Sequence, residues 1–162
     1  MLDIYVDGDA CPVKKEVYRV AERHGLKVLV VSHGSLRVPA EGRVERVRVK
    51  QGFGAADYWI AEHIGECDIC VTADVPLADR CLKRGARVLA PYGEVFTEAS
   101  IGNALASRDL MDHLRQMGEI TGGPAPFVPA DRSRFLSRLD EIIWALKRGK
   151  AGKGNRPLTE DR

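Results

Sequence analysis

The sequence contains little of the residue types that would mark a specialised class of protein. Of its 162 residues only 6% are aromatic and four are cysteine, and the formal net charge is +2. Four cysteines in a chain of this length do not predict the disulfide framework of a small secreted domain. A net charge so near zero does not indicate nucleic-acid binding by the whole surface, so only a local basic patch can support it.

Long apolar runs are missing as well. No stretch reaches the roughly 20 residues that a membrane-spanning helix requires, and no charged segment followed by an apolar one marks a secretion signal. We therefore expect a cytoplasmic protein that does not contact a membrane. With 44% hydrophobic and 30% charged residues, the chain has the composition of one globular domain with its own core.

The spacing of Cys67 and Cys70 allows two interpretations. A pair three residues apart is typical of redox and zinc sites, but this pair lies in an apolar run with the character of a strand, where neighbours three apart face opposite sides. No second Cys or His pair follows at zinc-finger spacing. We interpret the cysteines as structural thiols.

Short apolar runs alternate with amphipathic segments along the chain. Expected strands cover residues 2–6, 26–31, 44–49, 68–72 and 86–90. Expected helices cover residues 12–24, 55–64, 76–84, 97–117 and 131–148, the last one capped by Asp131. This alternation predicts right-handed βαβ units, and hence an α/β fold with a mainly parallel sheet between helical layers.

One domain accounts for almost the whole chain. We expect residues 1–148 to form it, because no internal repeat or change of composition marks a boundary. Residues 149–162 are polar and rich in glycine, so we expect a disordered tail there. The run at 44–49 mixes valine with arginine and is expected near an edge of the sheet.

Acidic residues occupy the junctions between these elements. Asp7 and Asp9 follow the first strand, and Asp74 follows the strand at 68–72. Asp57 begins the next helix of the pattern, and Asp79 lies early in the helix after Asp74. The carboxyl ends of parallel strands and the amino ends of crossover helices share one edge of a sheet, where ligands bind. The five carboxylates are therefore expected to converge.

Each of these acids also has an ordinary interpretation, because aspartate is a preferred residue at a helix start. Capping explains one acid per helix, whereas Asp7 with Asp9, and Asp74 with Asp79, provide two. Converging carboxylates repel one another unless a cation or shared protons neutralise them. Oxygen ligands select Mg²⁺ or Mn²⁺, so we predict a metal site formed by Asp7, Asp9, Asp57, Asp74 and Asp79.

Such a site suits attack of a metal-activated water on a phosphodiester, with Asp7, Asp57 and Asp74 as catalytic residues. Two other functions stay open. An Asp-x-Asp pair after a strand is also the nucleophile and acid–base pair of haloacid-dehalogenase phosphatases, although no cap insertion precedes the helix expected at Pro12. Acids that only cap helices would fit a non-catalytic module that binds RNA or protein.

Basic residues cluster after the second expected strand. Three of them alternate along the chain and share one face of a strand: Arg46, Arg48 and Lys50. They either contact phosphates or prevent association at an edge of the sheet, and the sequence leaves both interpretations open. Lys14 lies in the first turn of a helix, where the dipole disfavours a cation unless an acid or a phosphate is near. Lys14 and Arg37 are candidate substrate contacts.

Six motifs in order resemble the YaiI/YqxD family of uncharacterised bacterial proteins, over residues 1–147. They are Asp7-Gly8-Asp9-Ala10-Cys11-Pro12, Leu36-Arg37-Val38-Pro39, Ala56-Asp57-Tyr58-Trp59-Ile60, Thr72-Ala73-Asp74-Val75-Pro76-Leu77-Ala78, Arg108-Asp109-Leu110-Met111-Asp112 and Thr121-Gly122-Gly123-Pro124. The resemblance also adds Arg108 to the candidate substrate contacts. Gly54 stands where members often carry a further aspartate, so the acidic cluster has one ligand fewer than in those members.

That family is in turn similar to PIN-like domains, a fold of metal-dependent nucleases with a parallel sheet and an acidic pocket. The likeness rests mainly on Asp7, Asp57 and the 72–74 stretch. It implies a three-layer α/β/α fold and a nuclease that acts on RNA with Mg²⁺ or Mn²⁺. Fold alone does not fix function, so the activity is a hypothesis at this point.

Overall fold

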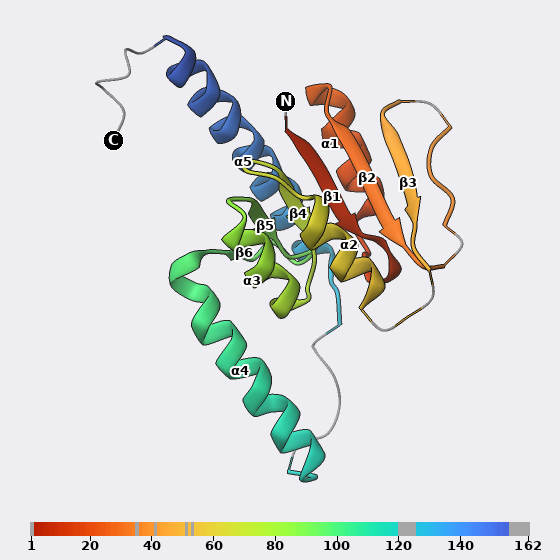
Figure 1. Cartoon of the computed structure of the whole chain (residues 1–162), viewed down its shortest axis with the longest axis vertical. Helices are drawn as coiled ribbons and strands as arrows, with labels where there is room; N and C mark the ends of the chain where they lie inside the picture. Colours follow the sequence, from red (N-terminus) through yellow and green to blue (C-terminus); the bar gives the residue numbers. More distant parts are fainter. Residues whose placement is uncertain are drawn as a thin grey trace.

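The computed structural model of the protein describes residues 2–34, 36–40, 42–50, 52, 54–119 and 126–155. Its strands are β1 (Asp3–Asp7), β2 (Lys27–Ser32), β3 (Val44–Arg48), β4 (Ile69–Val71), β5 (Arg87–Leu89) and β6 (Val95–Phe96). Its helices are the 3₁₀ turn η1 (Gly8–Ala10), α1 (Lys14–His24), α2 (Ala55–His63), α3 (Val75–Lys83), α4 (Glu98–Gln116) and α5 (Pro129–Asn155). Figure 1 shows their arrangement.

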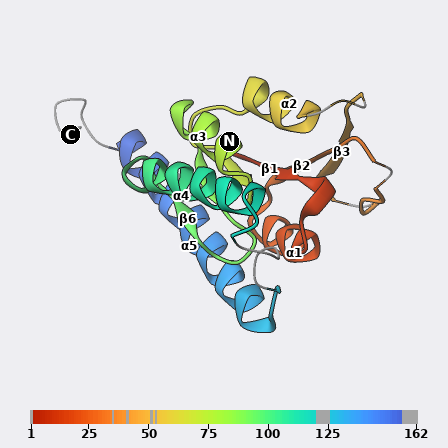
Figure 2. The ribbon, with the colours of Figure 1, turned by 90° about the horizontal axis from the view of Figure 1, so that it is seen from below.

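The strands form one sheet in the order β3-β2-β1-β4-β5-β6. All neighbours pair in parallel except β5 and β6. Figure 2 shows the sheet between α1 and α5 on one side and α2 and α3 on the other. The predicted three-layer α/β/α fold with a mainly parallel sheet is therefore confirmed, and β3 lies at the edge where its sequence places it.

The alternation of side chains along the central strands builds a core on each face. Ile4 and Val6 of β1 pack with α1 and α5, whereas Tyr5 between them packs with α2 and α3. Strands covered on both faces must be apolar at every position, which is why β1, β2 and β4 appear in the sequence as continuous apolar runs rather than as alternating ones.

The short strand β6 is the element that the periodicity does not predict. It has two residues and pairs antiparallel with β5. The chain reverses between the two strands at Gly93, which has a φ of 97° that glycine adopts without strain. Two residues are too few to carry a repeat, so this strand has no signature of its own. Apart from the end of the last helix, the remaining boundaries agree with expectation to within one or two residues, including the start of α1 at Lys14.

The last helix, α5, begins at Pro129, two residues before the predicted cap. Proline suits the first helical position because its missing N–H has no partner there anyway. Asp131 still acts as a cap, since its Oδ2 accepts the backbone N–H of Val128 at 3.0 Å. The helix extends to Asn155, seven residues past its expected end, so residues 149–155 of the expected tail are helical. Residues 156–162 of that tail lie outside the described residues, as do residues 120–125, which include the motif Thr121-Gly122-Gly123-Pro124.

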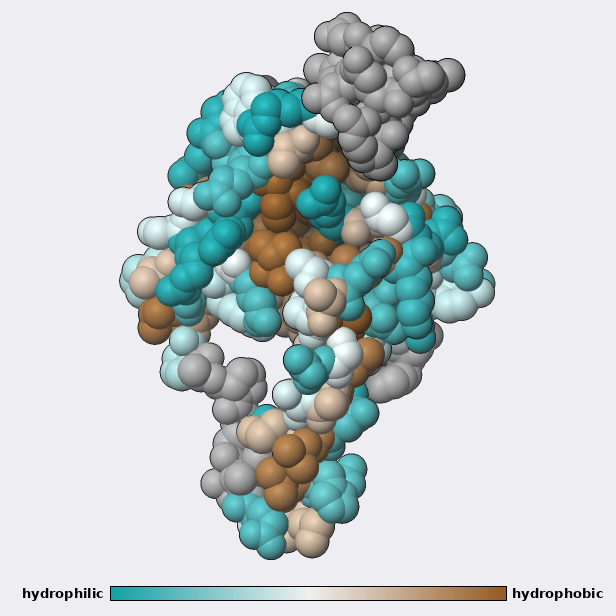
Figure 3. Space-filling view, turned by 90° about the vertical axis from the view of Figure 1, so that its left-hand side faces the viewer, coloured by the Kyte–Doolittle hydropathy of each residue, from teal (hydrophilic) through white to brown (hydrophobic). Residues whose placement is uncertain are grey.

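The helix α4 starts on the body of the protein and projects away from it (Figure 1). Ile101 near its start is buried, whereas Leu110 and Met111 further along, and Met117 just past its end, are exposed. Figure 3 shows apolar side chains gathered on the projecting end. Within the described ranges, the structure contains no helix of the length and apolarity that crossing a bilayer demands.

Replacing Leu139 by alanine should destabilise the protein strongly. Leu139 of α5 is fully buried in the core beneath the sheet, so its truncation leaves a cavity that costs about 3 kcal/mol of unfolding free energy. Urea denaturation followed by circular dichroism measures this. The adjacent Arg138→Ala is the control, because its side chain is 52% exposed and should cost less than about 0.5 kcal/mol. Equal effects of the two substitutions would contradict the packing described for α5.

Candidate functional site

The ends of β1 and β4 create the centre of the candidate site. These two strands are parallel neighbours, so Asp7 at the end of β1 lies beside Thr72, which follows β4. The buried hydroxyl of Thr72 donates to Oδ2 of Asp7 at 3.1 Å and accepts the backbone N–H of Asp74 at 3.0 Å. One side chain therefore fixes the position of two acids. Thr72 was not among the site residues selected from the sequence, although it is the last residue of the strand expected at 68–72.

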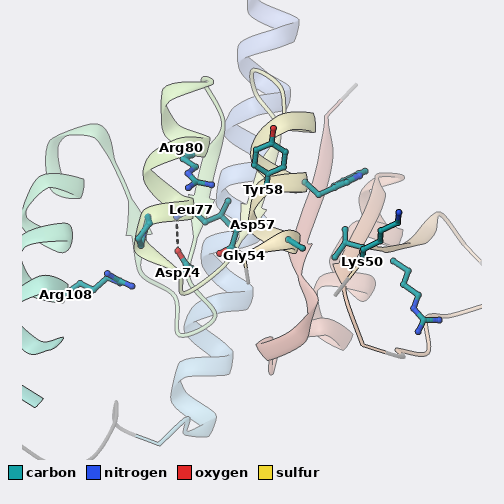
Figure 4. Close-up of a pocket in the computed structure, with 13 residues that line it drawn as sticks. Lys50, Gly54, Asp57, Tyr58, Asp74, Leu77, Arg80 and Arg108 are labelled. Atoms are coloured by element: carbon teal, nitrogen blue, oxygen red, sulfur yellow. Dashed lines mark hydrogen bonds between the residues drawn. The ribbon is translucent and has the colours of Figure 1, made fainter. Parts of the chain in front are cut away.

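Asp74 has two roles at the start of α3. Its Oδ1 accepts the backbone N–H of Leu77 at 2.9 Å, which makes it the N-cap of this helix. Its carboxyl group also lies within hydrogen-bonding reach of Asp57, which α2 contributes. Figure 4 shows Asp57 and Asp74 between α2 and α3 in the same cavity. Asp74 is therefore an N-cap, as the ordinary interpretation expects, but it also contacts a second acid.

Capping does not explain the other two acids. Asp7 precedes the turn η1 but its side chain makes no capping hydrogen bond. The N-cap of α2 is Gly54, and Asp57 lies inside the first turn of that helix. Asp7, Asp57 and Asp74 are called the acidic group below.

Electrostatics shows that the acidic group is crowded. Burial, together with the charges of Asp74 and Asp7 and a hydrogen bond to Asp74, raises the pKa of Asp57 to about 6. Burial also raises the pKa of Asp7, with contributions from Asp74 and Asp9 that the hydrogen bond from Thr72 partly offsets. At a pH near 6, Asp57 is therefore protonated in part of the molecules.

Asp9 binds the loop after β2 instead of facing Asp57. Its Oδ2 accepts the backbone N–H of His33 at 3.2 Å and lies 2.9 Å from Nδ1 of the same residue. Its Oδ1 accepts the N–H of Gly34 at 3.4 Å. Partial burial acts to raise the pKa of Asp9, but these hydrogen bonds outweigh it and hold the pKa below its ordinary value. The contacts thus commit Asp9 to the loop, although its charge still reaches Asp7.

Two further candidate residues also have structural partners. Asp79 of α3 pairs with Lys83 one turn later, at 3.0 Å. Lys14 donates its Nζ to the carbonyl oxygens of Gly8 and Cys11, at 3.2 and 3.0 Å. Lys14 therefore closes the turn η1, which explains a cation in the first turn of α1 without a phosphate.

A cavity of about 700 Å³ opens over two members of the acidic group. Asp57 and Asp74 line it, and so do four cations, called the cationic rim: Arg48, Lys50, Arg80 and Arg108. Two parts of the rim come from opposite sides, the first pair from the end of β3 and the second from α3 and α4. A smaller cavity of about 280 Å³ is lined by Asp7, Thr72 and Asp74. Asp74 lines both cavities, so the acidic group is accessible from two sides.

The basic residues Arg46, Arg48 and Lys50 do not all have the same surroundings, so neither of the two interpretations that the sequence left open applies to all three. Arg48 and Lys50 line the cavity, whereas Arg46 donates to the carbonyl oxygen of Leu36 at 2.9 Å. Arg108 also lines the cavity, with Nη1 at 3.6 Å from both Asp109 and Asp112. Arg37 is exposed on the loop between β2 and β3.

Cys11 lines the smaller cavity beside Asp7, whereas the other three cysteines line neither cavity. All four are free, and Cys67 precedes β4 with a left-handed φ of 68°. Cys70 and Cys81 are fully buried. Among the described residues, no three His, Cys, Asp or Glu side chains are arranged as a ready metal cage. The acidic group nevertheless presents only oxygen donors, and Mg²⁺ commonly binds through one or two carboxylates while keeping several waters. The donor set therefore fits a hard divalent cation.

The raised pKa of Asp57 should make the metal-free protein less stable at neutral than at mildly acidic pH. The folded state holds this proton up to about pH 6, whereas the unfolded chain releases it near pH 4, so the free energy of unfolding falls as pH rises through that interval. Asp57→Asn removes the effect and should raise the Tm at pH 7 by about 3 °C. Thermal unfolding between about pH 4 and 7 tests this, with the exposed Asp109→Asn as control. If the Tm of Asp57→Asn depended on pH as the wild-type Tm does, the crowding of Asp57 with the other acids would be refuted.

Comparison with known proteins agrees with the ordered motifs. The model of the family described as "Uncharacterized BCR, YaiI/YqxD family" matches residues 5–145. A "UPF0178 protein" of Nitrobacter winogradskyi is 57% identical over 150 residues, which cover 93% of this chain and 96% of that one. Proteins with the same name from Rhodopseudomonas palustris strain BisB18 and Brucella ovis are 60% and 58% identical, covering 90% of this chain and 94% and 91% of theirs. No solved structure matches the chain. The chain therefore belongs to the YaiI/YqxD family.

Proposed function

We propose that this protein is a Mg²⁺- or Mn²⁺-dependent nuclease that hydrolyses phosphodiester bonds, with RNA as its substrate. One observation carries the proposal: Asp57 and Asp74 lie within a cavity whose rim is cationic, and Asp7 lies beside Asp74 in an adjoining smaller cavity. The acidic and the basic side chains of the cavity suit ligands of opposite charge. The acids suit a divalent cation, and the rim suits the phosphates of a polyanion. RNA, as opposed to DNA, rests on the PIN-like fold alone.

Asp7, Asp57 and Asp74 would hold the metal ion, which supplies an activated water and neutralises charge as the phosphodiester is attacked. The residues of the chain prepare this chemistry. Thr72 holds Asp7 and the backbone of Asp74 in place. Asp57 would release its proton to the solvent on binding a cation. The guanidinium of Arg80 acts to lower the pKa of Asp57, so it favours the ionised form.

The two alternative functions have less support. A haloacid-dehalogenase phosphatase needs Asp9 beside the substrate as an acid–base group, but its oxygens accept hydrogen bonds from His33 and Gly34. A non-catalytic module whose acids only cap helices accounts for Asp74, yet leaves Asp7 and Asp57 without a role. The proposed nuclease uses all three acids.

Metal binding should depend on Asp7 and Asp74 and not on Asp79. Millimolar Mn²⁺ should raise the Tm of the wild type by several degrees, since a ligand at a hundred times its Kd adds about 2.7 kcal/mol. Asp7→Asn and Asp74→Asn should lose most of this shift. Asparagine is itself a good N-cap, so Asp74→Asn leaves α3 intact. Asp79→Asn is the matched control and should keep the wild-type response. A wild type that shows no shift would count against the proposal.

Metal-dependent cleavage should follow the same residues. End-labelled RNA should be cleaved in Mn²⁺ and not in EDTA, and Asp7→Asn should slow cleavage at least about a hundredfold, because loss of even an outer partner of a metal ligand costs up to that much. Labelled DNA in parallel reactions decides between the two nucleic acids. Formation of a beryllofluoride adduct at Asp7, with hydrolysis of phosphomonoesters alone, would instead identify a phosphatase.

A further inference from the structure

Tyr58 is an aromatic side chain without an aromatic or polar partner at the mouth of the cavity. It follows Asp57 in the first turn of α2, is 64% exposed and lines the cavity of the acidic group. Within the part of the chain that the structure describes, its ring takes part in no hydrogen bond, ring stack or cation contact. Figure 4 shows the ring above Asp57 and Asp74, across the cavity from Arg80.

Three other aromatic side chains among the described residues, those of Trp59, Tyr92 and Trp144, differ from Tyr58 because each of them has a partner. Trp59 stacks on His63 at 3.8 Å between ring centroids, with an interplanar angle of 12°. Trp144 of α5 contacts His24 edge-on at 5.1 Å, and Tyr92 donates its hydroxyl to Glu94 at 2.8 Å. Tyr58 thus presents an exposed ring at the mouth of the cavity.

The cations around Tyr58 lie on two sides of the acids. Figure 4 shows Lys50 on one side of Asp57, and Arg80 and Arg108 on the other. Arg48 and Lys50 also line a neighbouring cavity of about 550 Å³ together with His33 and Gly34. The basic wall at the end of β3 therefore continues beyond the acidic group. A ligand that carries several phosphates can contact the cations on both sides.

We propose that Tyr58 is a base-stacking residue, which selects single-stranded nucleic acid whose phosphates are held on both sides of the acidic group by Arg48 with Lys50 and by Arg80 with Arg108. The inference rests on the proposed nuclease function and adds its substrate class. Every base has a flat face that can stack on a tyrosine ring, so the contact tolerates any sequence. A base within a duplex is already stacked on its neighbours and must first leave them. The ring therefore favours unpaired strands.

Measurements of nucleic-acid binding in the absence of metal test this inference separately from cleavage. Fluorescence anisotropy in EDTA is measured for labelled oligouridylate, oligothymidylate and a blunt duplex. The wild type should bind both single strands more tightly than the duplex. Tyr58→Ala should bind the single strands about tenfold more weakly, whereas Tyr58→Phe keeps a stacking ring and should stay within about twofold of the wild type. Trp144→Ala, which removes an exposed aromatic side chain far along α5, should bind like the wild type.

The salt dependence of binding tests the phosphate contacts on the two sides. Arg48→Gln and Arg80→Gln should each lower the slope of log affinity against log salt concentration by about 0.7, since each removes one phosphate contact to a single strand. Arg87→Gln is the control, because this exposed arginine is the first residue of β5. It therefore lies at the amino ends of the parallel strands, opposite to the carboxyl ends where the acids lie. An unchanged slope in either cavity variant would overturn the two-sided arrangement.

The results separate the inference from the proposed function. Single-strand binding that depends on Tyr58, without metal-dependent cleavage, supports the inference and counts against the nuclease. Cleavage together with wild-type binding by Tyr58→Ala overturns the inference and leaves the nuclease standing. A duplex bound as tightly as the single strands also overturns it.

Discussion

The constraint on which the site depends is the crowding of the acidic carboxyl groups at one edge of a parallel sheet. Asp7 is fixed by the end of β1, Asp74 by the start of α3 and Asp57 by the first turn of α2. Burial and mutual repulsion raise the pKa values of Asp7 and Asp57. The arrangement costs stability in the absence of a cation, and the apolar packing on both faces of the sheet offsets that cost.

The fold maintains this crowding because few of the groups involved can move away. The hydroxyl of Thr72 joins Asp7 to the backbone of Asp74, and Asp74 is held a second time as the cap of α3. The cationic rim lies at the mouth of the cavity and leaves the acids facing one another. The proposed binding of a cation and of an anionic chain rests on this negative charge at the floor of the cavity and positive charge at its rim.

Much of this arrangement could be predicted from residue order. Acids placed after strands and at helix starts of an alternating α/β pattern must gather at one edge, so Asp7, Asp57 and Asp74 were predictable as a group. The same logic also selected Asp9 and Asp79, which the structure commits to His33 with Gly34 and to Lys83. Edge position is a property of the backbone, whereas the direction of a carboxylate depends on the nearest donor, which sequence spacing does not reveal.

The sequence by itself determined the layers, the mainly parallel sheet and the edge at which the acids meet, because apolar periodicity and the handedness of βαβ units leave few alternatives. Only the tertiary structure decided which charges share the cavity. It joined Lys50, Arg80 and Arg108 from three separate elements around Asp57, and it left Tyr58 exposed beside them. Those contacts depend on side-chain directions and on how far each helix is rotated against the sheet, and no local pattern encodes either.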